Sequence, residues 1–237
     1  MKTFRSLAKL SLALVAVSFL STPVFASGVQ VNLDVSNSNQ QYPDGTNYLL
    51  VTVSDGIDGS IDFKVETLDP LRQQMSKNSG LQSFSFNFGD SGATAQNILL
   101  PDGWSVKGGS GKSVNHSIFG NFDVQVQGTG SSRKDPLEFA IVGVNGDTPE
   151  DYIAELSTKG RVASLFATHV AGYNGTDDTY AFNGVELKVN NGHFGGASVV
   201  PIPAAAWLML SALGVLGWRG KKATTSKQRT DVAQLSQ

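Results

Sequence analysis

Hydrophobic and polar residues alternate with a period of two through most of the chain between residues 28 and 189. The run from Phe84 to Phe88 places three phenylalanines on one face, and residues 61–66 and 122–127 alternate in the same way. This period is typical of strands with one buried and one solvated face, as in antiparallel sheets. Gly, Asp, Asn and Pro bound the runs, as turn residues do. We therefore expect ten strands: 29–35, 47–54, 60–68, 81–88, 96–100, 103–107, 119–127, 137–144, 161–170 and 180–189.

One helix is predicted among these strands. Thr148 suits the N-cap position, Pro149 suits the first turn, and Glu150 and Asp151 suit the positive end of the helix dipole. We expect this helix to end near Gly160. Many short strands and a single short helix predict a mainly β fold, an antiparallel two-sheet sandwich that is jelly-roll-like.

The first 27 residues have the three parts of a secretory signal peptide. A basic stretch ends at Lys9, residues 10–20 are mostly apolar, and Val24-Phe25-Ala26 resembles a cleavage site. A retained membrane anchor is the alternative, but this apolar stretch is short for a bilayer span. We expect an N-terminal signal helix that signal peptidase removes, so that the mature chain begins near Ser27.

The region from 199 to 222 predicts a C-terminal transmembrane helix that stops export. An apolar run ends at Trp218, and a basic cluster of Arg219, Lys221 and Lys222 follows it. A run of about 20 apolar residues is long enough to cross a bilayer, and basic residues favour the cytoplasmic side. The middle of the chain would therefore lie on the opposite side of the membrane from the cytoplasm.

These segments divide the chain into five parts. Residues 1–27 are the signal peptide, and residues 28–189 are an extracellular β-sandwich domain. Residues 190–198 are polar and rich in glycine, which predicts a flexible linker. Residues 199–222 form the membrane segment with its basic cluster, and residues 223–237 form a cytoplasmic tail.

Charge and cysteine content narrow the range of partners and chemistry. Between residues 28 and 198 the sequence has 10 Lys and Arg and 19 Asp and Glu, a net charge of −9, whereas the whole chain has −2. Nucleic acids and anionic lipid surfaces are bound by clustered basic residues, so the acidic exported part argues against both. The chain has no cysteine, which excludes disulfides, thiolate nucleophiles and cysteine metal ligands.

The C-terminal segment resembles the PEP-CTERM class of bacterial sorting signals, in the variant that opens with Val-Pro-x-Pro-Ala-Ala. The matching residues that precede the apolar run are Val200, Pro201, Pro203, Ala204, Ala205 and Trp207. The two prolines keep the backbone extended just outside the bilayer, which is the form in which a protease or transpeptidase binds a peptide. The match covers about 24 of 237 residues, and the chain continues for 15 residues after the basic cluster, further than family members usually do.

This resemblance implies a route and a set of partners. Such proteins are exported by the Sec machinery, held in the inner membrane by the C-terminal helix, and cut near the proline motif by an exosortase-type membrane transpeptidase. Their setting is typically a Gram-negative bacterium that makes exopolysaccharide. An ordinary membrane anchor without processing is the alternative.

Two acidic loops are candidate sites for a structural Ca²⁺, and no other cofactor is expected. Ca²⁺ is a hard cation that takes oxygen ligands. One loop carries Asp55, Asp58 and Asp62, and the other carries Asp177 and Asp178. The alternative is that both are ordinary turns, which we favour because Asp-Gly is a strong hairpin signal and Asp55-Gly56 lies between two predicted strands.

The chain has three histidines, His116, His169 and His193, and no two have the close spacing of a metal-binding motif. We expect His169 to be a structural residue within a strand and His193 to belong to the linker. A three-histidine metal site assembled by the fold is the alternative.

Aromatic residues in predicted loops and strand ends are candidates for stacking on sugars. They include Tyr42, Tyr48, Trp104 and Tyr173. The other interpretation of Trp104 is that it packs under the turn at 101–103.

No catalytic motif is present. Gly111-Lys112-Ser113 looks like the end of a phosphate loop but lacks its first glycine, and no G-x-S-x-G sequence occurs. We therefore expect a non-enzymatic protein, sorted to the cell surface or matrix and associated with exopolysaccharide or biofilm. The alternatives are a carbohydrate-binding module and an exported glycan hydrolase or lyase, which would need two carboxylates in one cleft.

Overall fold

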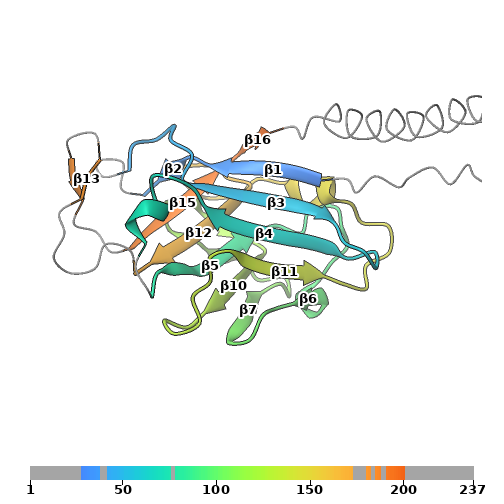
Figure 1. Ribbon diagram of the computed structural model, residues 1–237. Helices are drawn as coiled ribbons and strands as arrows, with labels where there is room; N and C mark the ends of the chain where they lie inside the picture. Colours follow the sequence, from blue (N-terminus) through green and yellow to red (C-terminus); the bar gives the residue numbers. More distant parts are fainter. Residues whose placement is uncertain are drawn as a thin grey trace, which may run out of the picture.

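The computed structural model describes residues 28–37, 42–75, 78–172, 180–182, 185–187 and 191–200. Its regular structure is mainly β and antiparallel, as predicted (Figure 1). The predicted signal helix, transmembrane helix and tail lie outside the described residues. Within the described residues, no helix is both long enough and apolar enough to cross a bilayer.

Six strands form the first sheet, sheet A, in the order β16-β1-β3-β4-β11-β6, and every neighbouring pair is antiparallel. The strands are Ser198–Val200 (β16), Gly28–Leu33 (β1), Leu49–Asp55 (β3), Ile61–Thr67 (β4), Leu137–Ile141 (β11) and Ile98–Leu99 (β6). In β4 the apolar residues Ile61, Phe63 and Val65 are buried, whereas Asp62 and Lys64 between them face outward. The alternation in the sequence therefore marks the inner and outer faces correctly.

Six further strands form the second sheet, sheet B, in the order β2-β15-β12-β5-β10-β7. They are Val35–Ser36 (β2), Asn191–Gly196 (β15), Phe166–Ala171 (β12), Gly80–Phe86 (β5), Val124–Gly128 (β10) and Trp104–Gly108 (β7). Two short pairs lie outside the sheets: β8 (Val114–Asn115) with β9 (Asn121–Phe122), and β13 (Tyr180–Phe182) with β14 (Val185–Leu187). The short 3₁₀ helices are η1 (Arg72–Gln74), η2 (Ala95–Asn97), η3 (Ser117–Phe119) and η4 (Pro149–Ile153).

The inner faces of the two sheets share one apolar core. Phe63 of sheet A is fully buried, and its ring stacks on that of Phe139 with centroids 4.7 Å apart. The same ring lies 5.1 Å from Phe86 of sheet B and 5.4 Å from Tyr152 of η4. Offset and edge-on aromatic pairs of this kind stabilise a core beyond the area they bury.

The predicted helix begins at the expected residue but is shorter and more tightly wound. Its first turn is closed by the Asp151 carboxylate, which accepts hydrogen bonds from the Thr148 amide at 2.7 Å and from the Thr148 hydroxyl at 3.1 Å. The element is a 3₁₀ helix that ends at Ile153, not an α-helix that reaches Gly160. The helix does not continue because Ser157, which follows it, forms a hydrogen bond with another segment: Ser157 Oγ donates to the carbonyl of Phe119 at 2.6 Å.

The prediction of a flexible linker at 190–198 is wrong. Asn191–Gly196 is β15, which pairs with both β2 and β12 inside sheet B, and Ser198–Val200 is the edge strand β16 of sheet A. The glycines permit close packing instead of flexibility. A Cβ at Gly195 would lie 2.5 Å from the ring of Phe119, and one at Gly196 would lie 2.2 Å from the Asn32 carbonyl oxygen.

Candidate functional site

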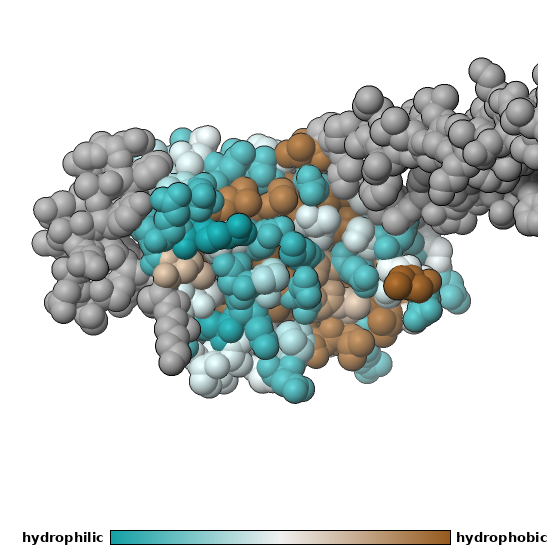
Figure 2. Space-filling model, viewed as in Figure 1, coloured by the Kyte–Doolittle hydropathy of each residue, from teal (hydrophilic) through white to brown (hydrophobic). Residues whose placement is uncertain are grey.

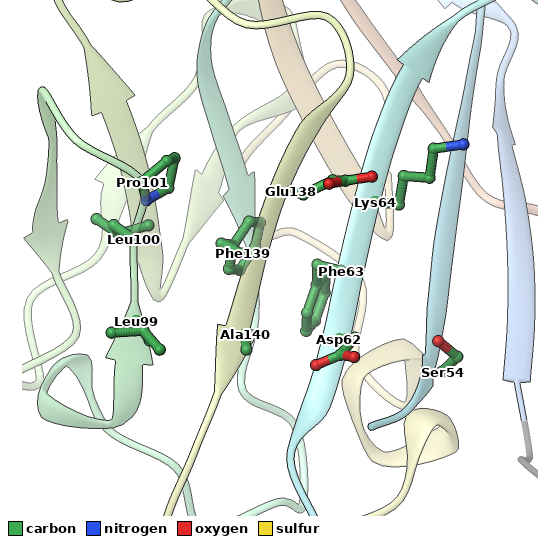
Figure 3. A pocket seen from close by; sticks show the side chains of 10 residues that line it. All are labelled: Ser54, Asp62, Phe63, Lys64, Leu99, Leu100, Pro101, Glu138, Phe139 and Ala140. Carbon is green, nitrogen blue, oxygen red and sulfur yellow. The ribbon is translucent and has the colours of Figure 1, made fainter. Parts of the chain in front are cut away.

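The outer face of sheet A carries a groove of about 500 Å³ on its β4, β11 and β6 side (Figure 3). The residues that line the groove are Ser54, Asp62, Phe63, Lys64, Leu99, Leu100, Pro101, Glu138, Phe139 and Ala140. Its volume falls within the range of small-molecule sites, about 300–1,000 Å³.

Strand register brings the polar side chains of the groove together. Glu138 of β11 lies opposite Lys64 of β4, and Asp62 lies opposite both Ala140 and Ser54. Asp62 and Glu138 are therefore diagonal neighbours on one face, at a backbone separation of about 7–8 Å. Figure 3 shows both carboxylates with the Lys64 side chain beside Glu138.

Ionic and hydrogen-bonding contacts hold two of these groups. The Lys64 ammonium lies 3.0 Å from the Glu66 carboxylate, and Ser60 Oγ donates to Asp62 Oδ1 at 2.9 Å. Both Asp62 and Glu138 are exposed. The groove therefore presents carboxylate acceptors and one cation to solvent.

The other wall of the groove is apolar. Leu99 is 62% exposed although leucine is among the residue types most often buried, and Leu100 and Pro101 follow it. Figure 2 shows an apolar patch near β6. Carboxylate acceptors beside an exposed apolar wall suit a ligand that has hydroxyl groups and an apolar face.

A second cluster of functional side chains lies on the outer face of sheet B and contains all three histidines of the chain. His169 and His193 are cross-strand partners on β12 and β15, and their rings stack with centroids 4.4 Å apart. His116 precedes η3, and its Nε2 lies 3.1 Å from Nδ1 of His193. We call these three residues the histidine cluster.

Two polar residues fix the orientation of His116. Its Nδ1 lies 2.7 Å from Ser85 Oγ and 3.1 Å from Nε2 of Gln125, and the Gln125 amide also donates to Ser85 at 3.1 Å. An amide nitrogen only donates, so Nδ1 of His116 accepts, and Nε2 carries the proton that points at His193.

This Ser–His contact is not a hydrolytic pair. A nucleophilic serine must reach its substrate, whereas Ser85 is fully buried. The partner of the imidazole is His193 instead of a carboxylate. The geometry fits a structural hydrogen-bond network that keeps His116 buried.

Burial keeps the histidine cluster neutral. Desolvation, followed by the neighbouring His193 and His169, lowers the pKa of His116 to about 3. Desolvation, then His193 and the Arg133 guanidinium, lowers the pKa of His169 to about 4, and desolvation lowers the pKa of His193. All three imidazoles are therefore uncharged at neutral pH.

No metal site is assembled in the described part of the chain, where no group of three or more His, Asp or Glu is arranged to hold an ion. The fold does bring the three histidines together, but as a stacked and hydrogen-bonded cluster. The placement of His193 in the linker was wrong because β15 is part of sheet B.

The favoured interpretation of the first acidic loop, a turn, is confirmed. Asp55 ends β3, and the Gly56 amide donates to the Ser60 carbonyl at 2.7 Å as the chain turns into β4. Asp58 lies in this turn, and Asp62 belongs to the groove. Asp177 and Asp178 lie outside the described residues.

The predicted sugar-stacking role is wrong for the three described aromatics. Tyr42 and Tyr48 are fully buried in the core, where they contact each other and Phe194. Trp104 is only 9% exposed, and its indole N–H donates to the Ser132 carbonyl at 2.7 Å. Tyr173 lies outside the described residues.

The predicted sorting motif begins where the described part of the chain ends. Val200 is the last residue of β16, and Pro201 to Trp207 and the basic cluster lie outside the described residues. Three residues of the groove, Leu99, Lys64 and Glu138, were not identified as site residues from the sequence. The alternating pattern could show that Lys64 and Glu138 face outward, but only the register of β4 against β11 places them together.

No family model matches this chain, and no curated protein or solved structure matches it either.

Proposed function

We propose that this chain is an exported, non-enzymatic protein whose β-sandwich is sorted to the cell surface or extracellular matrix by its C-terminal segment. Its partners on that route would be the Sec machinery, signal peptidase and an exosortase-type transpeptidase. Its setting would be a Gram-negative bacterium, with exopolysaccharide or biofilm as the final surroundings and no nucleic acid among its partners. Before processing, the C-terminal helix would hold the protein in the inner membrane.

The observation that carries this proposal is the pairing of β1 with β16. Antiparallel pairing places the start of β1, next to the predicted signal-peptide cleavage site, beside the end of β16, next to the proline motif. A sandwich from 28 to 200 would therefore stay whole if the chain were cut at both expected places.

The position of the groove supports a contact with matrix glycan. The groove runs from β3 to β6 of sheet A, and at its near end Ser54 lies opposite Gly28 of β1. Neighbouring strands are about 4.8 Å apart, so the near end of the groove lies roughly 10 Å from β16 and its β6 end roughly 24 Å. In a tethered domain the β11 and β6 end of the groove would be the part farthest from the attachment edge.

We infer a jelly-roll-like topology as the finer description of the fold. The chain changes sheet between β4 and β5, between β5 and β6, and again between β10, β11 and β12. Repeated crossing between two packed antiparallel sheets is the pattern of jelly rolls.

The enzymatic alternative has one observation in its favour, the diagonal pair Asp62 and Glu138. Their backbones are about 7–8 Å apart, which is near the separation of the carboxyl groups in an inverting glycosidase. Both are exposed, however, so neither has the apolar surroundings that keep a general acid protonated. The groove therefore supports binding better than hydrolysis.

Mass spectrometry of the protein released from the surface of its native type of host tests the proposal. We expect a mature form that begins near Ser27 and ends between 200 and 203, and its loss when Pro201 and Pro203 are both changed to Ala. Ile202→Ala is the matched control, since it keeps both prolines. An intact C-terminus that stays in the membrane fraction would contradict sorting and reduce the protein to an anchored ectodomain.

A further inference from the structure

A folded-back segment packs on the outer face of sheet B and contributes His116 to the histidine cluster. It consists of residues 114–122 and 157–165, which we call the strap. Its two halves are joined by backbone hydrogen bonds between Asn121 and Thr158 at 2.7 and 3.0 Å and by the Arg161 amide, which donates to Ile118 at 2.7 Å. The two halves of the strap are therefore joined to each other.

The strap contacts the sheet through a small apolar cluster, one imidazole and, at its end, Leu165, whose amide donates to the Gly196 carbonyl at 2.9 Å. Phe119 and Phe122 are buried with Ala167 of β12, apart from the main core. His116 is the buried polar contact, at 2% exposure, and bonds to Ser85, Gln125 and His193. The attachment of the strap thus depends on His116 keeping its contacts with Ser85, Gln125 and His193, which form a polar niche.

Among the described residues, none that faces the niche carries a negative charge, and the group that raises the pKa of His116 is the backbone carbonyl of Thr168. β5 presents Ser85, β10 presents Gln125, β12 presents His169 and β15 presents His193. The nearby charge is positive: the Arg133 guanidinium, held by Gln82 and by the Asn78 carbonyl, lowers the proton affinity of His169. The electrostatic contributions to the low pKa of His116 come from His193 and His169.

A proton added to His116, or to the nitrogen of His193 that faces it, meets a donor. On Nδ1 of His116 it would face the Gln125 amide N–H at 3.1 Å, and on Nδ1 of His193 it would face the N–H of His116 at 3.1 Å. A buried charge without a partner is strongly unfavourable. Protonation therefore favours any conformation in which His116 reaches water.

We propose that the strap is an acid-released cover: protonation of the histidine cluster detaches residues 114–122 and 157–165 from sheet B while the two-sheet core stays folded. The release is local because, apart from Leu165 at its end, which belongs to the main core, the strap is held by few buried apolar side chains, whereas the main core contains aromatics from both sheets. Segments with few buried contacts open at lower free energy than the whole domain. Opening would expose Phe119, Phe122 and the outer face of β12 and β15.

Hydrogen–deuterium exchange of the full-length chain, with rates corrected for intrinsic pH dependence, tests this proposal. One proton taken up by His116 on opening raises the opening equilibrium by about 50-fold between pH 6.5 and pH 4.5, given an ordinary pKa of 6.5 in the open form. We expect that increase in peptides that cover the strap, with no change in peptides from β3 and β4. Equal increases in both sets would mean global unfolding and would overturn the proposal.

Two variants separate the histidine from general acid effects. His116→Gln keeps a neutral hydrogen-bonding side chain, so the acid-induced increase should shrink at least tenfold. Lys112→Gln, an exposed charge change just before the strap, should leave the increase unchanged. A full acid response in His116→Gln would overturn the proposal.

Proton NMR covers the case in which His116→Gln does not fold. The chain's three histidines give three ring titrations in the wild-type protein, and we expect strap exchange to follow them. Exchange that rises without any histidine titrating would overturn the proposal. So would a loss of strap protection at pH 7.5 on adding EDTA, since a bound metal would then hold the cluster.

Discussion

Gln30 and Val200 lie opposite each other in the antiparallel pair β1–β16, which joins the beginning of the sandwich to its end. Val200 is also the first residue of the proline motif. The motif therefore begins within a strand of the folded domain, not at the end of a flexible tether. The pairing of β1 with β16 can be tested directly, without any assay of motif processing.

A cysteine pair at these two positions should form a disulfide. The chain has no native cysteine, and directly opposite residues have Cα atoms about 4.5–5.5 Å apart, within the range that a disulfide can bridge. We expect oxidised Gln30→Cys/Val200→Cys to lose both free thiols in a thiol titration. Asn32→Cys/Val200→Cys is the off-register control, and equal cross-linking of that pair would show that β16 does not hold this register.

Gly195→Ala should destabilise the strap. The new Cβ would lie 2.5 Å from the Phe119 ring, and overpacking of this kind costs about 1–3 kcal/mol. Urea unfolding and strap exchange would measure the effect. Gly130→Ala is the control because its Cβ would meet its nearest neighbour, Arg133, at 3.8 Å. Similar stability of the two variants would contradict the packing of Phe119 on β15.

Gly195 also shows where prediction from the sequence failed. Glycine and polar residues at 190–198 are typical of a linker, but glycine serves equally where two backbones or a ring and a backbone must approach closely. Nothing local distinguishes these uses, because the ring that requires Gly195 belongs to Phe119, 76 positions earlier in the chain.

The strands themselves could be predicted because their signal is local. Alternation along residues 61–66 follows directly from one buried and one solvated face, and the start of η4 follows from Thr148 and Asp151. The run at 122–127 was predicted only in part, because Phe122 packs in the strap and Gln125 is buried. The histidine cluster could not be predicted, since it depends on the register of β12 with β15. The tyrosines were assigned wrongly because their loop positions in the sequence did not show that Tyr42 and Tyr48 turn into the core.

Acid should lower the free energy of unfolding of the whole domain. In the unfolded chain His116 binds a proton below about pH 6.5, whereas in the folded protein its pKa is about 3. The unfolded state therefore binds more protons in this window, so stability falls as pH falls from 6.5 towards 3. His116 alone should contribute a loss of about 2 kcal/mol between pH 7 and pH 5.

Urea unfolding at pH 7 and pH 5 measures this loss, and His116→Gln provides the comparison. The variant should lose about 2 kcal/mol less than the wild type between the two pH values. If wild type and variant lost the same amount, the neutral buried state of His116 would be refuted.

Phe63→Ala should remove a large share of the domain's stability. The side chain is 1% exposed and contacts aromatic rings from both sheets, and truncation of a buried phenylalanine costs about 3–5 kcal/mol. Ile57→Ala is the control, since Ile57 is fully exposed in the β3–β4 turn and should change stability by less than about 0.5 kcal/mol. If Phe63→Ala and Ile57→Ala lost similar amounts of unfolding free energy in urea, Phe63 would not be part of the core.

The groove should bind matrix glycan through its carboxylates. We expect Glu138→Gln with Asp62→Asn to weaken retention on exopolysaccharide from the native host by at least about tenfold, because one hydrogen bond to a charged group contributes about 1.5–3 kcal/mol. Glu155→Gln, an exposed acid outside the groove, is the control. Unchanged retention would leave sheet A without a ligand-binding role, and glycan cleavage by the wild type would favour the enzymatic alternative.

The late position of β15 and β16 in the chain sets the time at which this domain can fold. β15 occupies an interior place in sheet B between β2 and β12, and β16 completes the edge of sheet A, so neither sheet closes before residue 200 is available. Contacts between the two ends of a chain form slowly because the whole loop must close first. A chain that crossed a membrane amino end first would therefore be unable to close either sheet until nearly its last domain residue had passed.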